Sequence, residues 1–144
     1  MFIGEYLHSI DNKKRLAIPS RFRREFGEKA ILTRGLDNCL FLYPIQEWQK
    51  FSEKIGQLSM GQANTRSFAR LMLAGATEVD FDNLGRILIP DYLKNYADLK
   101  KKIIVAGILN RLEIWDQEKW EKYKEEVEKN TDAIAEKLGE LGLI

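Results

Sequence analysis

The sequence contains one cysteine, Cys39, and one histidine, His8. A single cysteine excludes an internal disulfide framework and fits a reducing compartment. No histidine or acidic cluster stands near Cys39, so the sequence suggests neither a metal site nor a Ser-His-Asp or Cys-His arrangement. A glycine loop of the kind that cradles phosphates is missing as well. We therefore expect no enzymatic activity, no catalytic residue, no bound metal and no cofactor.

Long hydrophobic runs are also absent. The longest clean apolar run, from Ile103 to Leu109, is far shorter than the roughly 20 residues that a membrane-spanning helix needs. Near the N-terminus, Glu5, His8 and Asp11 interrupt any apolar stretch of the kind found in secretory signals. We expect a soluble cytoplasmic protein without a membrane partner and, since no catalytic motif is present, without a small-molecule substrate.

The chain has almost no net charge, at +1, but its charges are unevenly distributed. Residues 1–72 hold 12 Lys and Arg against 7 Asp and Glu, whereas residues 73–144 hold 11 against 15. The positive charge of the first half is concentrated in Lys13, Lys14, Arg15, Arg21, Arg23 and Arg24. This clustering permits a basic surface, although a solvated face is the commoner explanation of a charge run.

The sequence does contain a duplication. The stretch D11-N-K-K-R-L-A-I-P19 returns seventy-one residues later as D82-N-L-G-R-I-L-I-P90, with five of nine positions identical. After one inserted residue the match continues with residues 31–43 against 103–115. Further matching pairs are Gly35 with Gly107, Asn38 with Asn110, and Trp48 with Trp120. Agreement in turn residues and aromatic anchors together indicates a tandem repeat.

Each repeat predicts the same order of elements. Strands are expected near 5–10, 15–18, 30–34 and 39–43, and again near 76–81, 86–89, 102–106 and 111–115. A short helix is expected after each proline, with Ser20 or Asp91 as its N-cap, and an amphipathic helix closes each repeat. We place the repeats at residues 5–47 and 76–119. A helix over 63–74 links them, and residues 120–144 form a C-terminal helical extension.

A repeat of this size buries too little surface to be stable alone, and its strands would leave open edges. We therefore expect a mainly β fold with peripheral helices, in which the two halves intertwine into one barrel about a pseudo-two-fold axis. The two Asp-x-x-x-Arg turns then occupy related positions.

Those turns, at residues 11–15 (turn 1) and 82–86 (turn 2), contain the candidate functional residues. An aspartate that opens a tight turn accepts hydrogen bonds from backbone N–H groups further along. The expected turn-forming residues are Asp11, Asn12, Asp82, Asn83 and Gly85. Lys14 stands where the second copy has Gly85, which predicts that turn 1 is strained or of another type.

Arg15 and Arg86 have two possible roles. In one, each folds back on the aspartate of its own turn as an exposed ion pair, worth only about 0–1 kcal/mol. In the other, the aspartate orders the turn while the arginine faces a phosphate or the edge of a guanine. The two roles are compatible, because a tethered arginine is preorganised. A carboxylate pair formed by Asp11 and Asp82 is a third, less favoured possibility, since a turn and a basic residue follow each aspartate.

Three segments resemble the MraZ family: M1-F-I-G-E-Y-L-H-S-I-D11, R15-L-A-I-P-S-R-F-R23 and L32-T-R-G-L-D-N-C-L-F-L-Y-P44. The second turn and the segment E113-I-W-D-Q-E-K-W120 fit the same pattern. The resemblance implies a swapped-hairpin AbrB-like (double-psi-like) β-barrel built from two SpoVT-AbrB-type repeats. It also implies a nucleoid-associated transcriptional regulator. As a ring-shaped homo-oligomer, such a regulator binds repeated short boxes in double-stranded DNA upstream of the division and cell-wall gene cluster.

The resemblance implies that Arg15 and Arg86 contact DNA. The other basic residues, Lys13, Lys14, Arg21 and Arg23, are then expected to contact phosphates or to remain solvated. Lys14 departs from the family pattern, which usually has glycine before the first arginine. A rival hypothesis, based on the acidic C-terminal helix and the apolar linker helix, is an assembly module whose partner is another protein.

Overall fold

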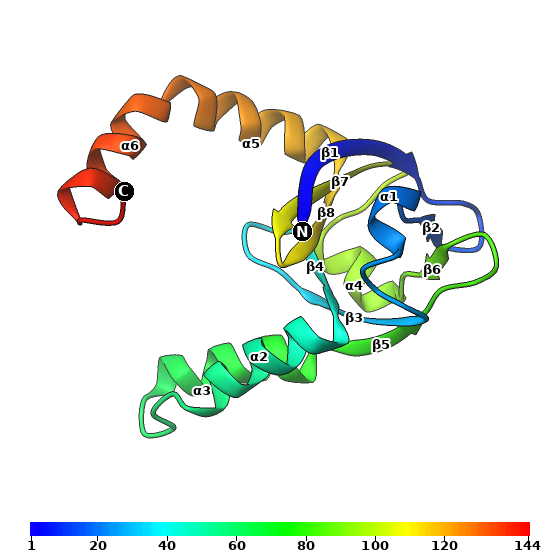
Figure 1. Ribbon diagram of the computed structural model, residues 1–144, viewed down its shortest axis with the longest axis horizontal. Coiled ribbons are helices and arrows are strands. Elements are labelled where there is room, and N and C mark those ends of the chain that lie inside the picture. Colours follow the sequence, from blue (N-terminus) through cyan, green and yellow to red (C-terminus); the bar gives the residue numbers. More distant parts are fainter.

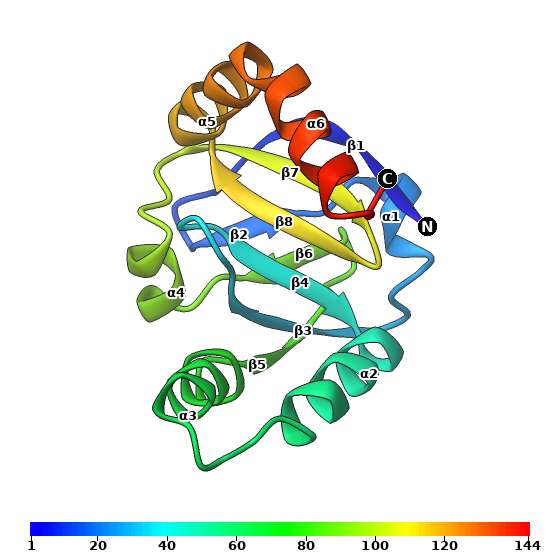
Figure 2. The same cartoon turned by 90° about the vertical axis from the view of Figure 1, so that its left-hand side faces the viewer.

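The structure, a computed structural model, describes all residues from Met1 to Ile144 and contains eight strands. These are β1 (Phe2–Ser9), β2 (Arg15–Ala17), β3 (Lys29–Arg34), β4 (Leu40–Pro44), β5 (Thr77–Asp80), β6 (Arg86–Leu88), β7 (Lys102–Leu109) and β8 (Arg111–Asp116). Six of them form one antiparallel sheet in the order β1-β7-β8-β4-β3-β5, and β2 pairs with β6 in a separate two-stranded ribbon (Figures 1 and 2).

The two repeats intertwine by pairing strands across the duplication. The first strand of each repeat pairs with the third strand of the other, so that β1 lies against β7 and β5 lies against β3. The closed barrel is not confirmed, because the six-stranded sheet is open and has β1 and β5 as its edges. The strands β2 and β6 end before Pro19 and Pro90, which cannot donate to a ladder. They pair with each other and do not join the two edges.

The predicted alignment of the two repeats is wrong by one residue along β3 and β7. Tyr43 and Trp115 are equivalent, but Tyr43 pairs with Ile31 whereas Trp115 pairs with Ile104. Ile31 therefore corresponds to Ile104 and not to Ile103. Both faces of these central strands are buried, so apolar residues follow one another and do not reveal which side chain faces which layer.

The six-stranded sheet has an apolar cluster on each face. On one face Leu40 and Leu42 pack with the inward side chains of the β2–β6 ribbon. On the other, Phe41 and Tyr43 pack with Trp115 and with residues of the helices. Successive residues of β4 thus point to opposite layers, as the period of a strand requires.

The helices are α1 (Ser20–Arg23), α2 (Ile45–Gly56), α3 (Ala63–Ala69), the π-helical turn η1 (Arg70–Ala74), α4 (Asp91–Tyr96), α5 (Gln117–Lys129) and α6 (Thr131–Glu140). The predicted linker helix is therefore α3 continued by η1. Ser20 and Asp91 make no side-chain cap hydrogen bond, contrary to expectation, and each is the first helical residue after a proline. Thr33 donates from its hydroxyl to the Met72 carbonyl of η1 at 2.7 Å, which ties that turn to β3.

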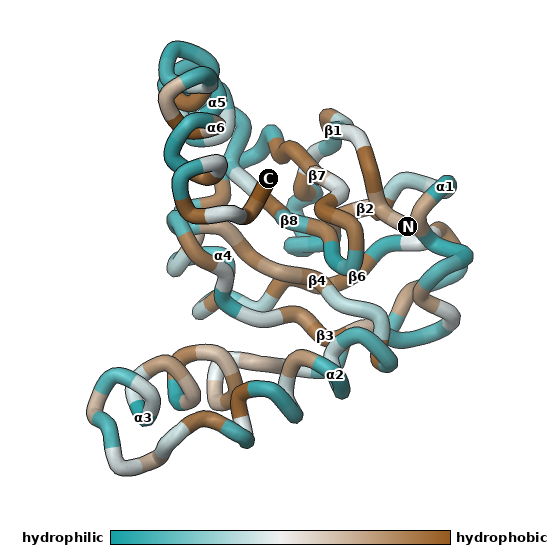
Figure 3. Tube along the Cα trace, turned by 60° about the vertical axis from the view of Figure 1, so that its left-hand side comes forward, coloured by the Kyte–Doolittle hydropathy of each residue, from teal (hydrophilic) through white to brown (hydrophobic).

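Helices α2, α3 and α5 lie on the opposite side of the six-stranded sheet from the ribbon (Figure 2). Most residues along α5 are hydrophilic (Figure 3), and neither α5 nor α6 has a buried residue. None of the helices is long and apolar enough to cross a membrane.

Candidate nucleic-acid interface

The β2–β6 ribbon gives the two predicted arginines a common outward face. Leu16 lies opposite Ile87, and both side chains are fully buried against the main sheet. Because side chains alternate along a strand, Arg15 and Arg86 point to the other face of the ribbon. The loops that contain the two turns project on the side of the molecule away from α2, α3 and α6 (Figure 1).

Turn 1 is organised by its aspartate. Asp11 Oδ1 accepts hydrogen bonds from the backbone N–H groups of Lys13 (2.8 Å) and Arg15 (2.9 Å), while Oδ2 accepts from Arg15 Nε at 2.9 Å. The Asp11 carbonyl also accepts from the Lys14 N–H at 3.0 Å. One side chain thus fixes both the backbone of the turn and the direction of the arginine.

Turn 2 repeats this arrangement. Asp82 Oδ1 accepts from the N–H groups of Leu84 and Arg86, each at 2.9 Å, and Oδ2 accepts from Arg86 Nε at 2.8 Å. Asn83, like Asn12 in turn 1, lies exposed beside its aspartate. The two turns also share hydrogen bonds with the opposite strands, because the Ile18 N–H donates to the Gly85 carbonyl and the Ile89 N–H donates to the Lys14 carbonyl.

Lys14 adopts the backbone conformation of the glycine that it replaces. Its φ is 62°, and that of Gly85 is 72°. The two turns are therefore of the same type, and turn 1 holds an L-residue in the left-handed region, at a cost of roughly 1–2 kcal/mol. The Lys14 ammonium forms an ion pair with Asp91 of the other repeat.

We predict that Lys14→Gly is more stable than Lys13→Gly by about 1 kcal/mol, even though Lys14→Gly also removes the ion pair with Asp91, which at an exposed site is worth only about 0–1 kcal/mol. Glycine relieves the left-handed strain only at residue 14, whereas at residue 13 it adds backbone entropy to the unfolded chain. Urea unfolding of both variants measures the difference. Equal midpoints would show that Lys14 is unstrained.

Both arginines keep part of their donor capacity. Their Nε atoms are bound to the aspartates, while no Nη atom of either residue makes a hydrogen bond within the chain. Arg86 Nη1 also lies 3.8 Å from Asp11 Oδ2, so Arg86 contacts both carboxylates. The side chains are 31% and 26% exposed for Arg15 and Arg86. Each turn thus presents a planar guanidinium of fixed orientation with free donors.

The hydrogen bonds lower the pKa of both aspartates. For Asp11 the main cause is the bond from the Arg15 backbone N–H, and for Asp82 it is the bond from the Arg86 backbone N–H. Two carboxylates that share a proton would instead show one strongly raised pKa. The geometry therefore does not favour the acid–base pair that the sequence left open.

This pKa depression predicts that the protein loses stability in acid. A carboxyl group whose pKa is lower in the folded state stabilises the fold above its ordinary value, here 3.8, and loses this effect as the pH falls through the folded pKa. We expect Asp11→Asn/Asp82→Asn to have a flatter stability profile than the parent below pH 3.8. Urea midpoints between about pH 2 and pH 6 test this, and parallel profiles would contradict it.

The remaining predicted contacts lie in different surroundings. Lys13 is exposed at the tip of turn 1. Arg21 donates to the Tyr6 hydroxyl and lies over the Tyr6 ring, with 5.6 Å between Cζ and the ring centroid. Arg23 differs from expectation: it is half-buried over Gly85, and its Nε is buried without a partner. Arg23 therefore covers turn 2 and is less accessible to a phosphate than Lys13.

Sequence reasoning missed a group of lysines beside turn 1. Lys94, Lys100 and Lys101 line a groove of about 290 Å³ together with residues of that turn. The available signals were the run Lys100–Lys102 and the position of Lys94, which matches Arg23 in the repeat. Neither signal shows that the segments meet, because the groove forms only when the second repeat packs against turn 1.

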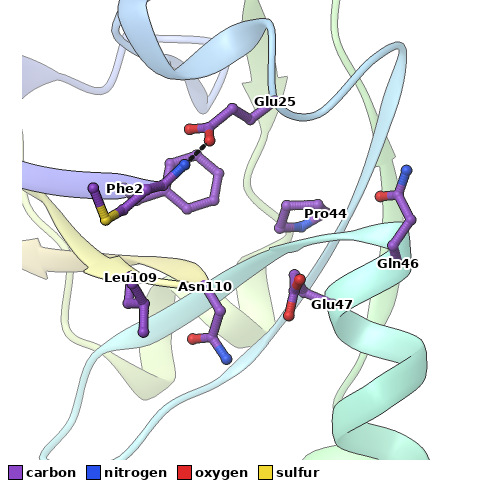
Figure 4. Close-up of a pocket in the computed structure, with 8 residues that line it drawn as sticks. Phe2, Glu25, Pro44, Gln46, Glu47, Leu109 and Asn110 are labelled. Atoms are coloured by element: carbon purple, nitrogen blue, oxygen red, sulfur yellow. Dashed lines mark hydrogen bonds and ion pairs between the residues drawn. The ribbon is translucent and has the colours of Figure 1, made fainter.

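A cavity of about 610 Å³ lies at the N-terminus (Figure 4), and no residue of either turn lines it. Glu25 and Glu47 supply its charged side chains, and Glu25 pairs with the N-terminal ammonium. An acidic lining disfavours a nucleic acid. No three His, Cys, Asp or Glu side chains are grouped as metal ligands.

A family model and full-length relatives among known proteins all match this chain to one family. The family model described as "MraZ protein, putative antitoxin-like" matches the chain twice, over residues 1–71 and 72–140, which confirms the duplication. The transcriptional regulators MraZ of Alkaliphilus metalliredigens and Clostridium tetani are each 48% identical over 143 residues, covering 99% of this chain and 100% of those proteins. That of Natranaerobius thermophilus is 45% identical over 138 residues, 96% of both chains. The chain therefore belongs to the MraZ family.

Proposed function

We propose that this protein is a sequence-specific DNA-binding transcriptional regulator without enzymatic activity or cofactor. The observation that carries the proposal is the pair of equivalent turns, each of which aims an aspartate-tethered arginine outward from one ribbon. Relatives of nearly the same length bear the name transcriptional regulator. Such a protein acts on chromosomal DNA, and we place it at the nucleoid.

In this proposal the β2–β6 ribbon faces the major groove, which is wide enough to admit a two-stranded β-ribbon. The free Nη atoms of Arg15 and Arg86 donate to the O6 and N7 acceptors of guanine, the commonest specific contact of arginine. Their Nε atoms stay on Asp11 and Asp82, so little side-chain entropy is lost on binding. Lys13 and Arg21 contact phosphates and position the ribbon.

A single ribbon makes few base contacts, so we further propose that a ring-shaped homo-oligomer binds repeated short boxes upstream of the division and cell-wall genes. A ring places identical ribbons at fixed spacing, with a gain in avidity on the order of 10²–10⁴. Box spacing should be about 10–10.5 bp, so that the contacts recur on one side of the duplex. The open edge of β1, with its exposed Ile3 and Leu7, is a surface that assembly would cover.

The boundaries of the repeats at 5–47 and 76–119, with an extension at 120–144, are part of the proposal. So is the description of the fold as a swapped-hairpin AbrB-like barrel. The reciprocal pairing of β1 with β7 and of β5 with β3 supports both.

Binding of a labelled duplex from upstream of the protein's own gene, compared with a scrambled duplex of equal length at the same salt concentration, tests the function. We expect tighter binding of the upstream duplex and a footprint with a repeat of about one DNA turn. Equal binding of both duplexes would refute the proposal and favour the rival assembly module.

A further inference from the structure

A basic groove lies beside turn 1. Four of the residues that line it are lysines: Lys14 from the turn, Lys94 from α4, and Lys100 and Lys101 from the segment that leads into β7. Asn12 of turn 1 belongs to the same lining. The groove has about 290 Å³, and its lining includes Asp11, the aspartate that binds Arg15.

The backbone that carries these lysines is firmly held. The Lys100 N–H donates to the buried carboxylate of Asp116 at 3.1 Å. The Lys101 carbonyl accepts from the Ile10 N–H at 2.9 Å, and the Lys94 carbonyl accepts from the Leu99 N–H at 3.0 Å. Fixed backbone positions with charged side chains at the surface form a preorganised basic site.

The nearby carboxylates do not neutralise the groove. Asp11 is occupied by the arginines of the turns, and Asp91 pairs with Lys14 at the rim. Asp98 pairs with Lys100 at 3.3 Å and with Lys119 at 3.5 Å. Lys94 and Lys101 take part in none of these pairs, and their charges remain available to an anion.

The fold places equivalent segments around turn 2, but they do not supply the same lysines. Arg23 takes the place of Lys94, four residues after its proline, and lies over Gly85. The Phe81 N–H donates to the Glu28 carbonyl beside turn 2, and the equivalent bond beside turn 1 runs from the Ile10 N–H to the Lys101 carbonyl. Glu28 is therefore the counterpart of Lys101, and an acidic residue lies beside turn 2 where turn 1 has a lysine. The two turns share one backbone geometry but differ in the charge around them.

We propose that the lysine groove beside turn 1 binds the sugar-phosphate backbone of the duplex whose bases the arginines contact. This inference rests on the proposed function, and it adds that each protomer binds DNA in a defined orientation. Lysine is a flexible point charge that suits phosphates and carries no base information. The duplex therefore extends farther over turn 1 than over turn 2, and each protomer binds its box in one orientation.

The test removes three of the charges by the substitutions Lys94→Gln, Lys100→Gln and Lys101→Gln in one chain. A matched control, Lys50→Gln, Lys54→Gln and Lys129→Gln, removes the same charge from α2 and α5. Fluorescence anisotropy at several salt concentrations measures binding of the upstream and scrambled duplexes. We expect the plot of log K for DNA binding against log salt concentration to be shallower for the groove variant, with a slope smaller in magnitude by about 2 to 3. This change should be the same for the upstream and the scrambled duplex, so that the ratio of their affinities is unchanged. The control should keep the parent slope.

Duplexes shortened from one end at a time test the defined orientation. The parent should lose affinity when one particular flank is removed, and the groove variant should be indifferent to that flank. A groove variant with the slope and flank dependence of the control would overturn the inference while leaving the proposed function intact. A parent that binds upstream and scrambled duplexes equally would instead refute the proposed function. In that case the salt slope still decides whether the groove binds DNA.

Discussion

Arg15→Ala and Arg86→Ala are each expected to weaken binding of the upstream duplex by about 100-fold while leaving binding of a scrambled duplex nearly unchanged. A bidentate contact to guanine contributes roughly 1–3 kcal/mol of discrimination, and each substitution removes one from every protomer. Anisotropy titrations with both duplexes at one salt concentration measure the effect. The double variant should bind the two duplexes equally.

Lysine at these positions separates charge from geometry. Arg15→Lys and Arg86→Lys keep the positive charge but cannot hold the aspartate through Nε and donate two further parallel bonds. We expect them to retain non-specific binding and to lose specificity. Circular dichroism and the melting temperature verify the fold of each variant. If the folded alanine variants bound the upstream duplex as the parent does, the arginines would serve only to fix the turns.

Gly107→Val should destabilise the protein more than any surface substitution. A Cβ at Gly107 would lie 2.5 Å from the Ile3 nitrogen and 2.6 Å from the Phe2 carbonyl carbon, so β1 would have to move away from β7. We expect a loss of about 3 kcal/mol of unfolding free energy, at the upper end of typical overpacking costs. The melting temperature should fall by roughly 10 °C, which scanning calorimetry measures.

Gly56→Ala is the matched control for this substitution. Gly56 ends α2, and a Cβ there would meet nothing within 4 Å. Alanine should raise stability by about 0.5 kcal/mol, because it restricts the unfolded chain and favours the helix. A Gly107→Val variant as stable as Gly56→Ala would mean that β1 does not approach β7 as closely as the structure has it.

The parts of the fold that depend on residues close together in the sequence could be predicted. The duplicated Asp-x-x-x-Arg stretch located both turns, and the open edges of the predicted strands indicated that the two halves intertwine into one barrel. The pairing of β1 with β7 and of β5 with β3 joins the two halves, but the closed barrel is not confirmed. For turn 1 the sequence predicted either strain or another turn type, and it could not decide between them. The positive φ at Lys14 depends on hydrogen bonds to Asp11 and to the other repeat.

Features that depend on distant segments could not be predicted. The alignment of β7 with β3 was predicted wrongly because Ile103 and Ile104 are equally apolar and both buried. Arg23 looked like a surface cation, but the glycine it covers lies in the other repeat. The lysines of the basic groove likewise belong to segments that meet turn 1 only after the repeats interlock.

The pairing of β1 with β7 also has a consequence for synthesis on the ribosome. Phe2 lies opposite Leu109 and Ser9 opposite Lys102, so β1 has no partner until about a hundred further residues have been translated. At about 5–20 residues per second, this strand remains unpaired for roughly 5–20 s. During that time its apolar side chains are open to chaperones and to the nascent chains of neighbouring ribosomes. The interlocked repeats thus delay formation of the sheet until β7 has been translated.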